Sequence, residues 1–400
     1  MHQITLINVT GRDRPGLTAK LTKQLADAGV QVLDMGQSVI HDYLTLGILV
    51  RFPQVRQPHL TALQALLIDE GLSVAMTPVL DSEYEDWVAK QGQQRTILTI
   101  LGRSITADQL ATLSEAVTLE GLNIDHISRL SGRVPLAPMS APTRACLEWS
   151  LRGSASAEFR KKMMALASDL ALDVAIQEDG IFRRHRRLIA FDMDSTLIET
   201  EVIDELAECA GVGQEVKAIT EAAMSGQMDF ASSLRARVAL LKGLKASTLA
   251  DIAEKLPLTE GVEVLFATLK RLGYKTAIIS GGFDYFGHVL QAELGVDYVF
   301  ANRLEVIDGY LSGQVLAPIM DAKGKAKTLT ELAQREAISM SQTIAVGDGA
   351  NDLEMLGAAG LGIAYHAKEI VRARSSHAIS TLGIDSILYL LGIKDHEQLS

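Results

Sequence analysis

Two carboxylates near the middle of this sequence are spaced so that they can act on the same group. Asp192 and Asp194 follow the apolar run 188–191, which is typical of a short buried strand. On an extended segment, side chains two positions apart point to the same side. Converging carboxylates repel each other unless a cation or a proton lies between them. The segment therefore indicates a metal or acid–base site. Taken alone, it could also be a helix N-cap next to a solvent-exposed acid.

Three later segments add groups suited to a phosphate and a metal ion. Ser280 and Gly281 follow a second apolar run and offer a hydroxyl and backbone N–H groups at an expected helix start. Lys323 offers a positive charge. Asp348 follows a third apolar run and offers an oxygen ligand for Mg²⁺, with Asn351 in the same loop. Each segment alone is an ordinary turn or surface site, but their order at successive strand ends favours one shared site.

The elements that must position these residues form an alternating pattern. Apolar strands and amphipathic helices alternate across residues 187–400, which predicts an α/β domain with a doubly wound parallel sheet and a site at the strand C-termini. Between the first strand and the next, residues 201–256 read as almost wholly helical. Because this insert follows the strand end directly, we expect it to cover the site as a helical cap.

The first 180 residues read as two copies of one small unit. Each copy has the order βαββαβ, which predicts a ferredoxin-like four-stranded sheet with two helices on one face. The copies are expected at residues 1–80 and 95–180, joined by a polar connector at 81–94. In the first copy we expect strands at 4–9, 30–38, 44–51 and 73–79 and helices at 18–28 and 59–70.

Composition limits the classes of function. The net charge of −11 disfavours binding to nucleic acid or to an anionic membrane. The basic run 183–187 is interpreted as a solvated linker or a domain-contact face. The N-terminus lacks the features of a signal peptide, and the two cysteines are far apart in sequence. We therefore expect a cytoplasmic protein with reduced thiols.

The motifs in the second half resemble the haloacid dehalogenase superfamily of phosphotransferases. The resemblance covers residues 187 to about 394 and rests on D-x-D-S-T at 192–196, S-G-G at 280–282, a lysine, and G-D-G-x-N-D at 347–352. It is closest to the phosphoserine phosphatases. It implies Mg²⁺-dependent hydrolysis of L-phosphoserine through a phospho-aspartyl intermediate on Asp192, the last step of serine biosynthesis.

The resemblance also implies a role for each catalytic position. Asp192 is expected to be the nucleophile and Asp194 the general acid and base. The Mg²⁺ ligands are expected to be Asp192, the backbone carbonyl of Asp194, and Asp348. Ser280, Gly281 and Lys323 are expected to bind the phosphate oxygens, and Asn351 is expected to line the substrate site and support the loop that carries Asp348.

Substrate choice is expected to depend on the insert. Glu201 can bind an ammonium group and Arg237 a carboxylate, which together fit an amino acid. The resemblance places Met224 and Phe230 near the substrate as an apolar cover. Without the resemblance, these four residues read as a solvated helix pair and ordinary core residues.

The two N-terminal units resemble ACT domains, which sense small molecules in amino-acid metabolism. The first carries the better match, because Pro15 and Gly16 turn the chain tightly into a helix whose free N–H groups can hold a carboxylate. The resemblance implies serine as a feedback ligand near Asp13, Gly16 and Leu17, and a homodimer. A turn without a ligand is the alternative. The second unit lacks this proline and glycine after Gly102, so its helix start is not expected to bind a ligand.

Three other functions remain open. The same catalytic residues could transfer phosphate from phosphoserine to another alcohol. They could also hydrolyse a sugar phosphate or a phosphoprotein, although the Glu201 and Arg237 pair argues against sugars. The chain could instead be a regulatory amino-acid sensor with a vestigial phosphatase half, but the complete catalytic set argues against that. The whole pattern resembles the long, regulated phosphoserine phosphatases of actinobacterial type.

Overall fold

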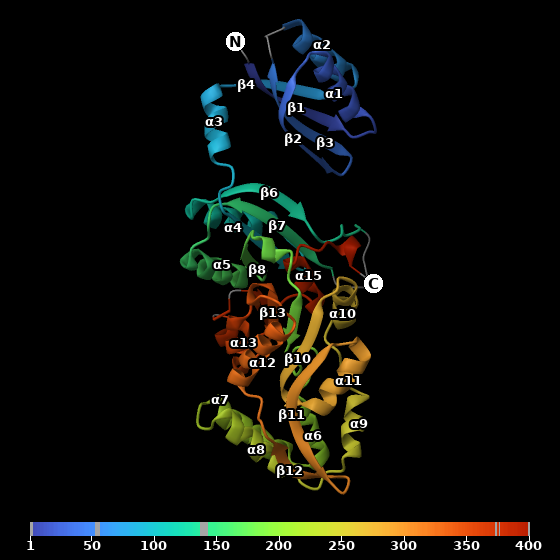
Figure 1. The fold of residues 1–400 in the computed structure, drawn as a ribbon, viewed down its shortest axis with the longest axis vertical. Coiled ribbons are helices and arrows are strands. Elements are labelled where there is room, and N and C mark those ends of the chain that lie inside the picture. The colour runs from blue at the N-terminus through green and yellow to red at the C-terminus, as the bar shows by residue number, and fades with distance from the viewer. Residues whose placement is uncertain (1–2, 53–56, 137–142, 373, 376, 399–400) are drawn as a thin grey trace. The chain divides into compact units, whose positions relative to one another are not determined.

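The computed structural model describes residues 3–52, 57–136, 143–372, 374–375 and 377–398 (Figure 1). The chain forms two compact units, residues 1–93 and residues 94–400. Within the described residues, no helix is both long and apolar enough to cross a lipid bilayer.

The first unit has the predicted βαββαβ order. Its four strands form an antiparallel sheet in the order β2-β3-β1-β4. Helix α3 (Asp81–Ala89) then occupies the segment for which only a polar connector was predicted, and acidic residues in its first turn favour the helix start. The elements before it are β1 (Gln3–Arg12), α1 (Leu17–Asp27), β2 (Gln31–Ile40), β3 (Tyr43–Phe52), α2 (Gln57–Asp69) and β4 (Ser73–Val79).

The second unit begins with a repeat of the same arrangement, as predicted. Its sheet has the order β6-β7-β5-β8, the same topology as the first unit. Buried residues of α4 and α5, including Leu113, Phe159 and Met163, pack with this sheet in one core. The elements are β5 (Arg95–Gly102), α4 (Ala107–Leu119), β6 (Asn123–Arg129), β7 (Ala145–Arg152), α5 (Ala157–Asp169) and β8 (Asp173–Glu178).

A seven-stranded sheet in the order β12-β11-β10-β9-β13-β14-β15 forms the rest of this unit. Strand β9 is central and pairs in parallel with β10 and β13, so the predicted doubly wound α/β fold is confirmed. Among the described strands of this sheet, only β11 and β12 pair antiparallel, as a hairpin. The strands are β9 (Leu188–Phe191), β10 (Lys275–Phe283), β11 (Tyr298–Ile307), β12 (Tyr310–Leu316), β13 (Thr343–Gly347), β14 (Leu361–Tyr365) and β15 (Ala378–Ile379).

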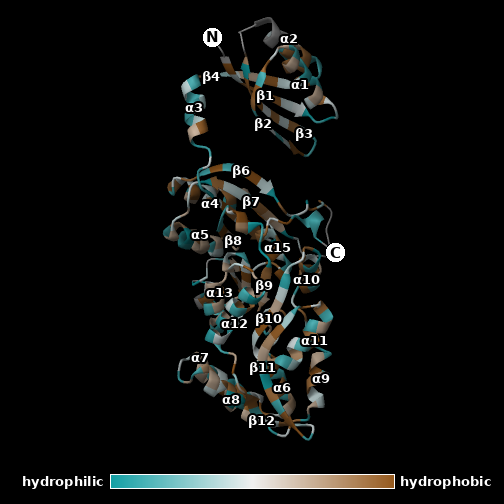
Figure 2. Ribbon diagram, in the orientation of Figure 1, coloured by the Kyte–Doolittle hydropathy of each residue, from teal (hydrophilic) through white to brown (hydrophobic). Residues whose placement is uncertain are grey.

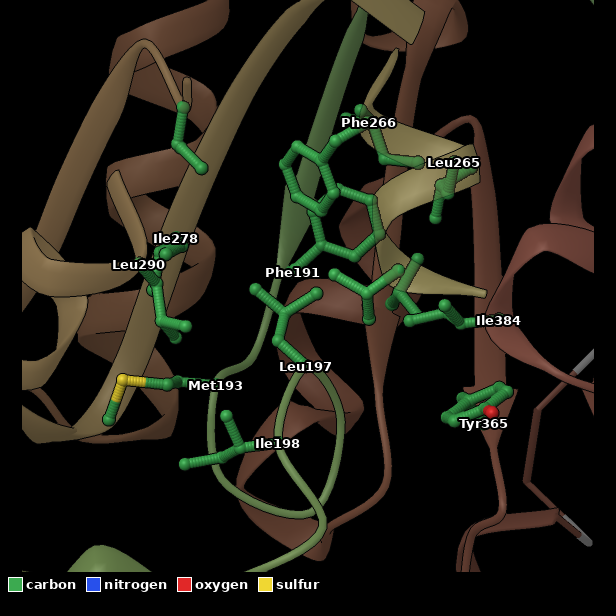
Figure 3. Packing of buried hydrophobic residues seen from close by; sticks show 14 of the residues in the cluster. Phe191, Met193, Leu197, Ile198, Leu265, Phe266, Ile278, Leu290, Tyr365 and Ile384 are labelled. Atoms are coloured by element: carbon green, nitrogen blue, oxygen red, sulfur yellow. The ribbon is translucent and has the colours of Figure 1, made fainter. Parts of the chain in front are cut away.

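The side chains of β9 alternate between two hydrophobic cores, one on each face of this sheet. Ile189 and Phe191 belong to the core under α10 and α11, and the rings of Phe191 and Phe266 lie 5.1 Å apart (Figure 3). Leu188 and Ala190 belong to the core under α12 and α13. The covering helices are α10 (Val262–Arg271), α11 (Asp284–Leu294), α12 (Ala322–Arg335), α13 (Leu353–Ala358), α14 (Glu369–Arg372) and α15 (Ile387–Leu390). Hydrophilic and hydrophobic residues both occur along these helices, as Figure 2 shows.

Four helices lie in sequence between β9 and α10: α6 (Val202–Ala210), α7 (Gly213–Met224), α8 (Phe230–Leu240) and α9 (Ser247–Ala253). They form the helical insert of this domain (Figure 1). The loop between α8 and α9 is hydrogen-bonded to the hairpin of β11 and β12, because the N–H of Gly243 donates to the carbonyl of Leu311 at 2.9 Å. The hairpin therefore holds one end of the insert.

The second small sheet joins the seven-stranded sheet along an edge, because β8 lies beside β15. The His377 ring lies between two carbonyl oxygens, 3.0 Å from that of Ile176 in β8 and 3.2 Å from that of Gly362 in β14. In the basic run, buried Arg186 donates to the carbonyls of Ser341 and Thr343 at 3.1 and 3.3 Å. Buried Arg183 pairs with Glu148 of β7. In this run, the domain-contact interpretation therefore holds for Arg183.

Candidate active site

Three carboxylates meet where the central strands end. Asp192 follows β9 directly, Asp348 follows β13 directly, and Asp352 lies one short turn further along. Each offers an oxygen, and these oxygens all lie within 4.8 Å of one another. Such a set of oxygen donors fits a divalent metal ion. The adjacent parallel strands β9 and β13 account for the close approach of Asp192 and Asp348.

A buried lysine, Lys325, lies against this acidic cluster. Its Nζ is 2.6 Å from Asp192 and 2.7 Å from Asp352. Asp352 also accepts a hydrogen bond from the N–H of Gly349 at 3.0 Å. Lys323, which the sequence suggested as the phosphate-binding cation, is exposed and does not line the site cavity. The structure therefore places Lys325, and not the predicted Lys323, against the acidic cluster.

The helical phase of α12 explains this correction. Two positions along a helix correspond to a rotation of about 200°, so Lys323 and Lys325 face opposite sides. Lys325 shares its side of the helix with the buried residues Leu329 and Leu332, spaced at i+4 and i+7. The apolar periodicity of 325–333 is the sequence signal that could have identified the correct lysine.

Burial and charge raise the proton affinity of the acids at the site. Burial, followed by the charges of Asp192 and Glu201, raises the pKa of Asp348 to about 7. Burial is also the main cause that raises the pKa of Asp194 well above its usual range. The protonated form of Asp194 is thereby favoured, which suits a proton donor. A cation near these acids would be stabilised by the same negative charge.

The Ser280–Gly282 segment lies at the end of β10, next to β9. The sequence placed it at a helix start, but the strand continues to Phe283 and α11 begins at Asp284. Gly281 is held from behind by the buried Asn302, whose side-chain amide donates to the Gly281 carbonyl at 2.8 Å. A Cβ at Gly282 would lie 2.3 Å from the Oδ2 of Asp194, so only glycine leaves room for this carboxyl group.

The predicted catalytic and substrate residues other than Lys323 line one cavity of about 660 Å³. Its lining includes Glu201, just before α6, and Arg237 on α8. Within the described chain, the Nε of Arg237 and the hydroxyl of Ser233 are buried without a hydrogen-bond partner. These two residues lie one turn apart on the same helix. Both residues line the cavity, so these two unpaired donors lie in its wall. The predicted residues that line it are Asp192, Asp194, Glu201, Met224, Phe230, Arg237, Ser280, Gly281, Asp348 and Asn351.

The apolar wall of the cavity comes mainly from the insert. Phe230 is partly buried, whereas Met224 is 64% exposed and therefore lies at the mouth of the cavity. Sequence reasoning missed Met228, which lines the same wall. It also missed Lys368, whose Nζ lies 3.8 Å from the Met224 sulfur across the mouth. No motif surrounds Lys368, so only the fold could bring it here.

The residues predicted to bind a regulatory ligand belong to the first small domain. Gly16 precedes α1 in a left-handed conformation, with φ of 92°, which favours glycine. Asp13 is exposed, and its N–H donates to the Asp42 carbonyl at 2.7 Å. Leu17 is buried in the core of this domain. The tight turn is present, while the ligand itself stays a prediction.

Comparison with known families agrees with this division of the chain. Residues 186–360 match the haloacid dehalogenase-like hydrolases, and residues 3–77 and 96–177 each match an ACT domain. Phosphoserine phosphatase SerB2 of Mycobacterium tuberculosis is 42% identical over 97% of this chain and 93% of its own length. Phosphoserine phosphatase of Streptomyces coelicolor is 40% identical over 98% and 93%. This chain belongs to the phosphoserine phosphatase family.

Solved structures support the family at the level of the fold. A haloacid dehalogenase family hydrolase from Salmonella enterica serovar Typhi is 33% identical in sequence, with a TM-score of 0.63. The match covers 74% of this phosphoserine phosphatase family member and 98% of the Salmonella chain. A probable phosphoserine phosphatase from Vibrio cholerae is 34% identical and covers 76% and 87%, with a TM-score of 0.57.

Proposed function

We propose that this chain hydrolyses L-phosphoserine to L-serine and phosphate, with Mg²⁺ as cofactor and Asp192 as nucleophile. The observation that carries the proposal is the placement of Glu201 and Arg237 in the same cavity as the acidic cluster. One end of this cavity suits a phosphate, and the other suits the ammonium and carboxylate groups of an amino acid.

The proposed reaction has two steps with balanced proton transfers. Asp192 attacks phosphorus with a carboxylate oxygen while the bond from phosphorus to the serine oxygen breaks. Asp194 donates its proton to that oxygen, and serine leaves as an alcohol. The Asp194 carboxylate then takes a proton from water, whose oxygen attacks phosphorus and frees Asp192. The raised pKa of Asp194 supports its first role as an acid.

Several groups would stabilise the transferring phosphoryl group. We propose that Lys325, the Ser280 hydroxyl and the Gly281 N–H contact its oxygens, with Asn351 beside them. Lys325 is buried and already paired with Asp192, so its charge is held at the reacting atom. Asn302 fixes the peptide that carries Gly281.

The donor set fits a divalent cation, because one lysine pairs with only two of the three clustered carboxylates and, among the described residues, leaves Asp348 without a cation. Asp192, Asp348 and the backbone carbonyl of Asp194 are the proposed ligands. When bound, Mg²⁺ supplies positive charge that offsets the charge of the phosphoryl group and the acids. Asp352 is held by Lys325 and Gly349, so we assign it a supporting position.

Metal affinity is expected to depend on pH through Asp348. Its pKa is raised to about 7, and a carboxyl group must lose its proton before it binds a cation. Above about pH 8 the group is already ionised, whereas below about pH 6.5 each pH unit should weaken Mg²⁺ binding about tenfold. Calorimetric titration in two buffers of different ionisation enthalpy measures both the affinity and the released proton. An affinity that stays constant as the pH falls would contradict this assignment.

Substrate choice is expected to depend on Arg237. Replacing Arg237 by methionine removes the bidentate partner of the substrate carboxylate, and kcat/KM for phosphoserine should fall about 100-fold or more. Hydrolysis of p-nitrophenyl phosphate, which has no amino-acid end, should change by less than about threefold. The matched control is Arg235→Met, because Arg235 is an exposed arginine on the same helix that does not line the cavity.

Steady-state phosphate release tests this substrate proposal, using L-phosphoserine, sugar phosphates and p-nitrophenyl phosphate. Preference for a sugar phosphate in the unmodified protein, or an equal loss on both esters in Arg237→Met, would overturn the assignment of Glu201 and Arg237. Release of serine and phosphate in equal amounts would indicate hydrolysis, whereas less phosphate than serine would indicate transfer to another alcohol.

We further propose that the chain forms a homodimer and that serine binds near Asp13, Gly16 and Leu17. The first ACT domain supports an interface, because its edge strand β2 exposes Val32, Met35 and other apolar side chains. Light scattering should give the mass of two chains, and calorimetry should detect millimolar serine. A monomer at micromolar protein concentration would contradict the homodimer. The serine site would be contradicted if serine gave no binding heat, or if Asp13→Ala bound serine as the unmodified protein does.

A further inference from the structure

A second cavity of about 650 Å³ lies between the second ACT domain and the seven-stranded sheet, and it is nearly as large as the active-site cavity. Helix α5 forms one wall. The other wall comes from Glu369 and Arg372 of α14, from Arg374 and Ser375, and from Ala378 of β15. The proposed reaction uses no residue of this cavity.

The walls of this cavity carry an excess of unpaired positive charge. Arg160 and Lys161 line it from α5, and Arg372 and Arg374 line it from the opposite wall. Among the residues that the structure describes, none of these four forms an ion pair. The Nε of Arg372 is buried and has no hydrogen-bond partner in the same part of the chain. Arg160 already donates to the Ile176 carbonyl, and the positive charge of the four side chains together favours an anionic ligand.

The carboxylates at the cavity do not balance these cations. Asp173 is already used, because its Oδ2 accepts hydrogen bonds from the N–H groups of Ser380 at 2.9 Å and Thr381 at 2.8 Å and from the Thr381 hydroxyl. Asp169 and Glu369 are exposed at the rim. Four cations therefore face three carboxylates, in a chain whose net charge is −11.

The floor of the cavity is apolar. Ala167, Leu172 and Val174 come from the core of the second ACT domain, and Ala378 comes from the core of the large sheet. Met164 packs against both cores. An apolar floor beneath a cationic rim suits a small organic molecule with an apolar body and one anionic group.

One turn of helix separates this cavity from the active site. Lys368 and Val371 line the active-site cavity, whereas Glu369 and Arg372 line the second cavity. The N–H groups of Val371 and Arg372 both donate to the Lys368 carbonyl, at 2.9 and 3.0 Å. Residues 368–372 therefore connect Arg372 at the second cavity to Lys368, which lies 3.8 Å from the Met224 sulfur at the mouth of the active site.

We propose that this cavity binds a small organic anion, a carboxylate or phosphate on an apolar body, and that residues 368–372 transmit its binding to the active site. The anion site does not depend on phosphoserine being the substrate. Its effect on turnover requires only that the active-site cavity hydrolyses a phosphate ester.

The test uses the full chain and the probe 8-anilinonaphthalene-1-sulfonate, which combines an apolar body with an anionic group. The double variant Lys161→Glu, Arg374→Glu reverses two exposed cations of the cavity. The control, Lys162→Glu with Arg184→Glu, makes the same charge change at exposed positions that do not line it. Probe fluorescence gives the affinity, and hydrolysis of p-nitrophenyl phosphate gives the effect on KM.

We expect the cavity variant to bind the probe at least about tenfold more weakly, while the control stays within about twofold. The probe should change KM at least about twofold in the unmodified protein and the control, and leave the cavity variant unaffected. Equal affinity in all three proteins would overturn the site. Loss of binding without any probe effect on KM in the unmodified protein would overturn the coupling. Failure to hydrolyse phosphoserine would instead remove the proposed function alone.

Discussion

Asp192→Asn is expected to lower kcat for phosphoserine by about three to six orders of magnitude, because an amide cannot form the phospho-aspartyl bond. The substitution preserves shape but removes the negative charge that faces Lys325 at 2.6 Å. It also replaces one of the three carboxylates of the acidic cluster by a neutral amide. Phosphate release under single-turnover conditions measures the effect without interference from product release.

A matched control separates this effect from a general loss of charge. Asp251 is an exposed carboxylate on α9 that does not line the cavity, so Asp251→Asn should leave kcat within about twofold. Circular dichroism and thermal unfolding establish that both variants are folded. An Asp192→Asn protein that is folded and turns over phosphoserine within about tenfold of the unmodified rate would remove Asp192 as nucleophile.

Lys325→Met is expected to reduce both stability and activity. Lys325 is fully buried between Asp192 and Asp352, so its removal leaves two buried carboxylates without a cation. Breaking a buried ion pair in this way costs about 3–5 kcal/mol in the free energy of unfolding. The loss of a charge that stabilises the phosphoryl group should also lower kcat by at least about 100-fold. Denaturant unfolding and phosphate release measure the two effects.

Lys323→Met is the control for this prediction. Lys323 is two positions away on the same helix and is exposed, so its removal should change the free energy of unfolding by less than about 0.5 kcal/mol. Its kcat should stay near that of the unmodified protein. The opposite outcome, with a stable and active Lys325→Met and an inactive Lys323→Met, would restore the assignment suggested by the sequence.

The sequence predicted the catalytic sheet because its signals are local. Asp192, Ser280 and Asp348 each follow an apolar run, and the parallel order brings such strand ends together. The choice between Lys323 and Lys325 depends instead on the phase of a helix against its sheet. That phase is set by Leu329 and Leu332, one and two turns further along.

Contacts between distant segments could not be predicted in this way. Lys368 and Met224 meet across the active-site mouth although 144 positions separate them. The cavity beside Arg160 and Arg372 exists only because β8 of one sheet lies against β15 of another. Neither strand carries a sequence motif that predicts which strand it will lie beside, because this edge contact depends on how the complete domains pack.

The most direct test of the central claim is chemical trapping of the phospho-aspartyl intermediate. The protein is mixed with L-phosphoserine and Mg²⁺, quenched within milliseconds, and reduced with borohydride, which converts an acyl phosphate on aspartate to homoserine. Peptide mass spectrometry should find homoserine at position 192, dependent on phosphoserine and absent from Asp192→Asn. Active protein that yields unmodified Asp192, or homoserine at another aspartate such as Asp194 or Asp348, would contradict the account.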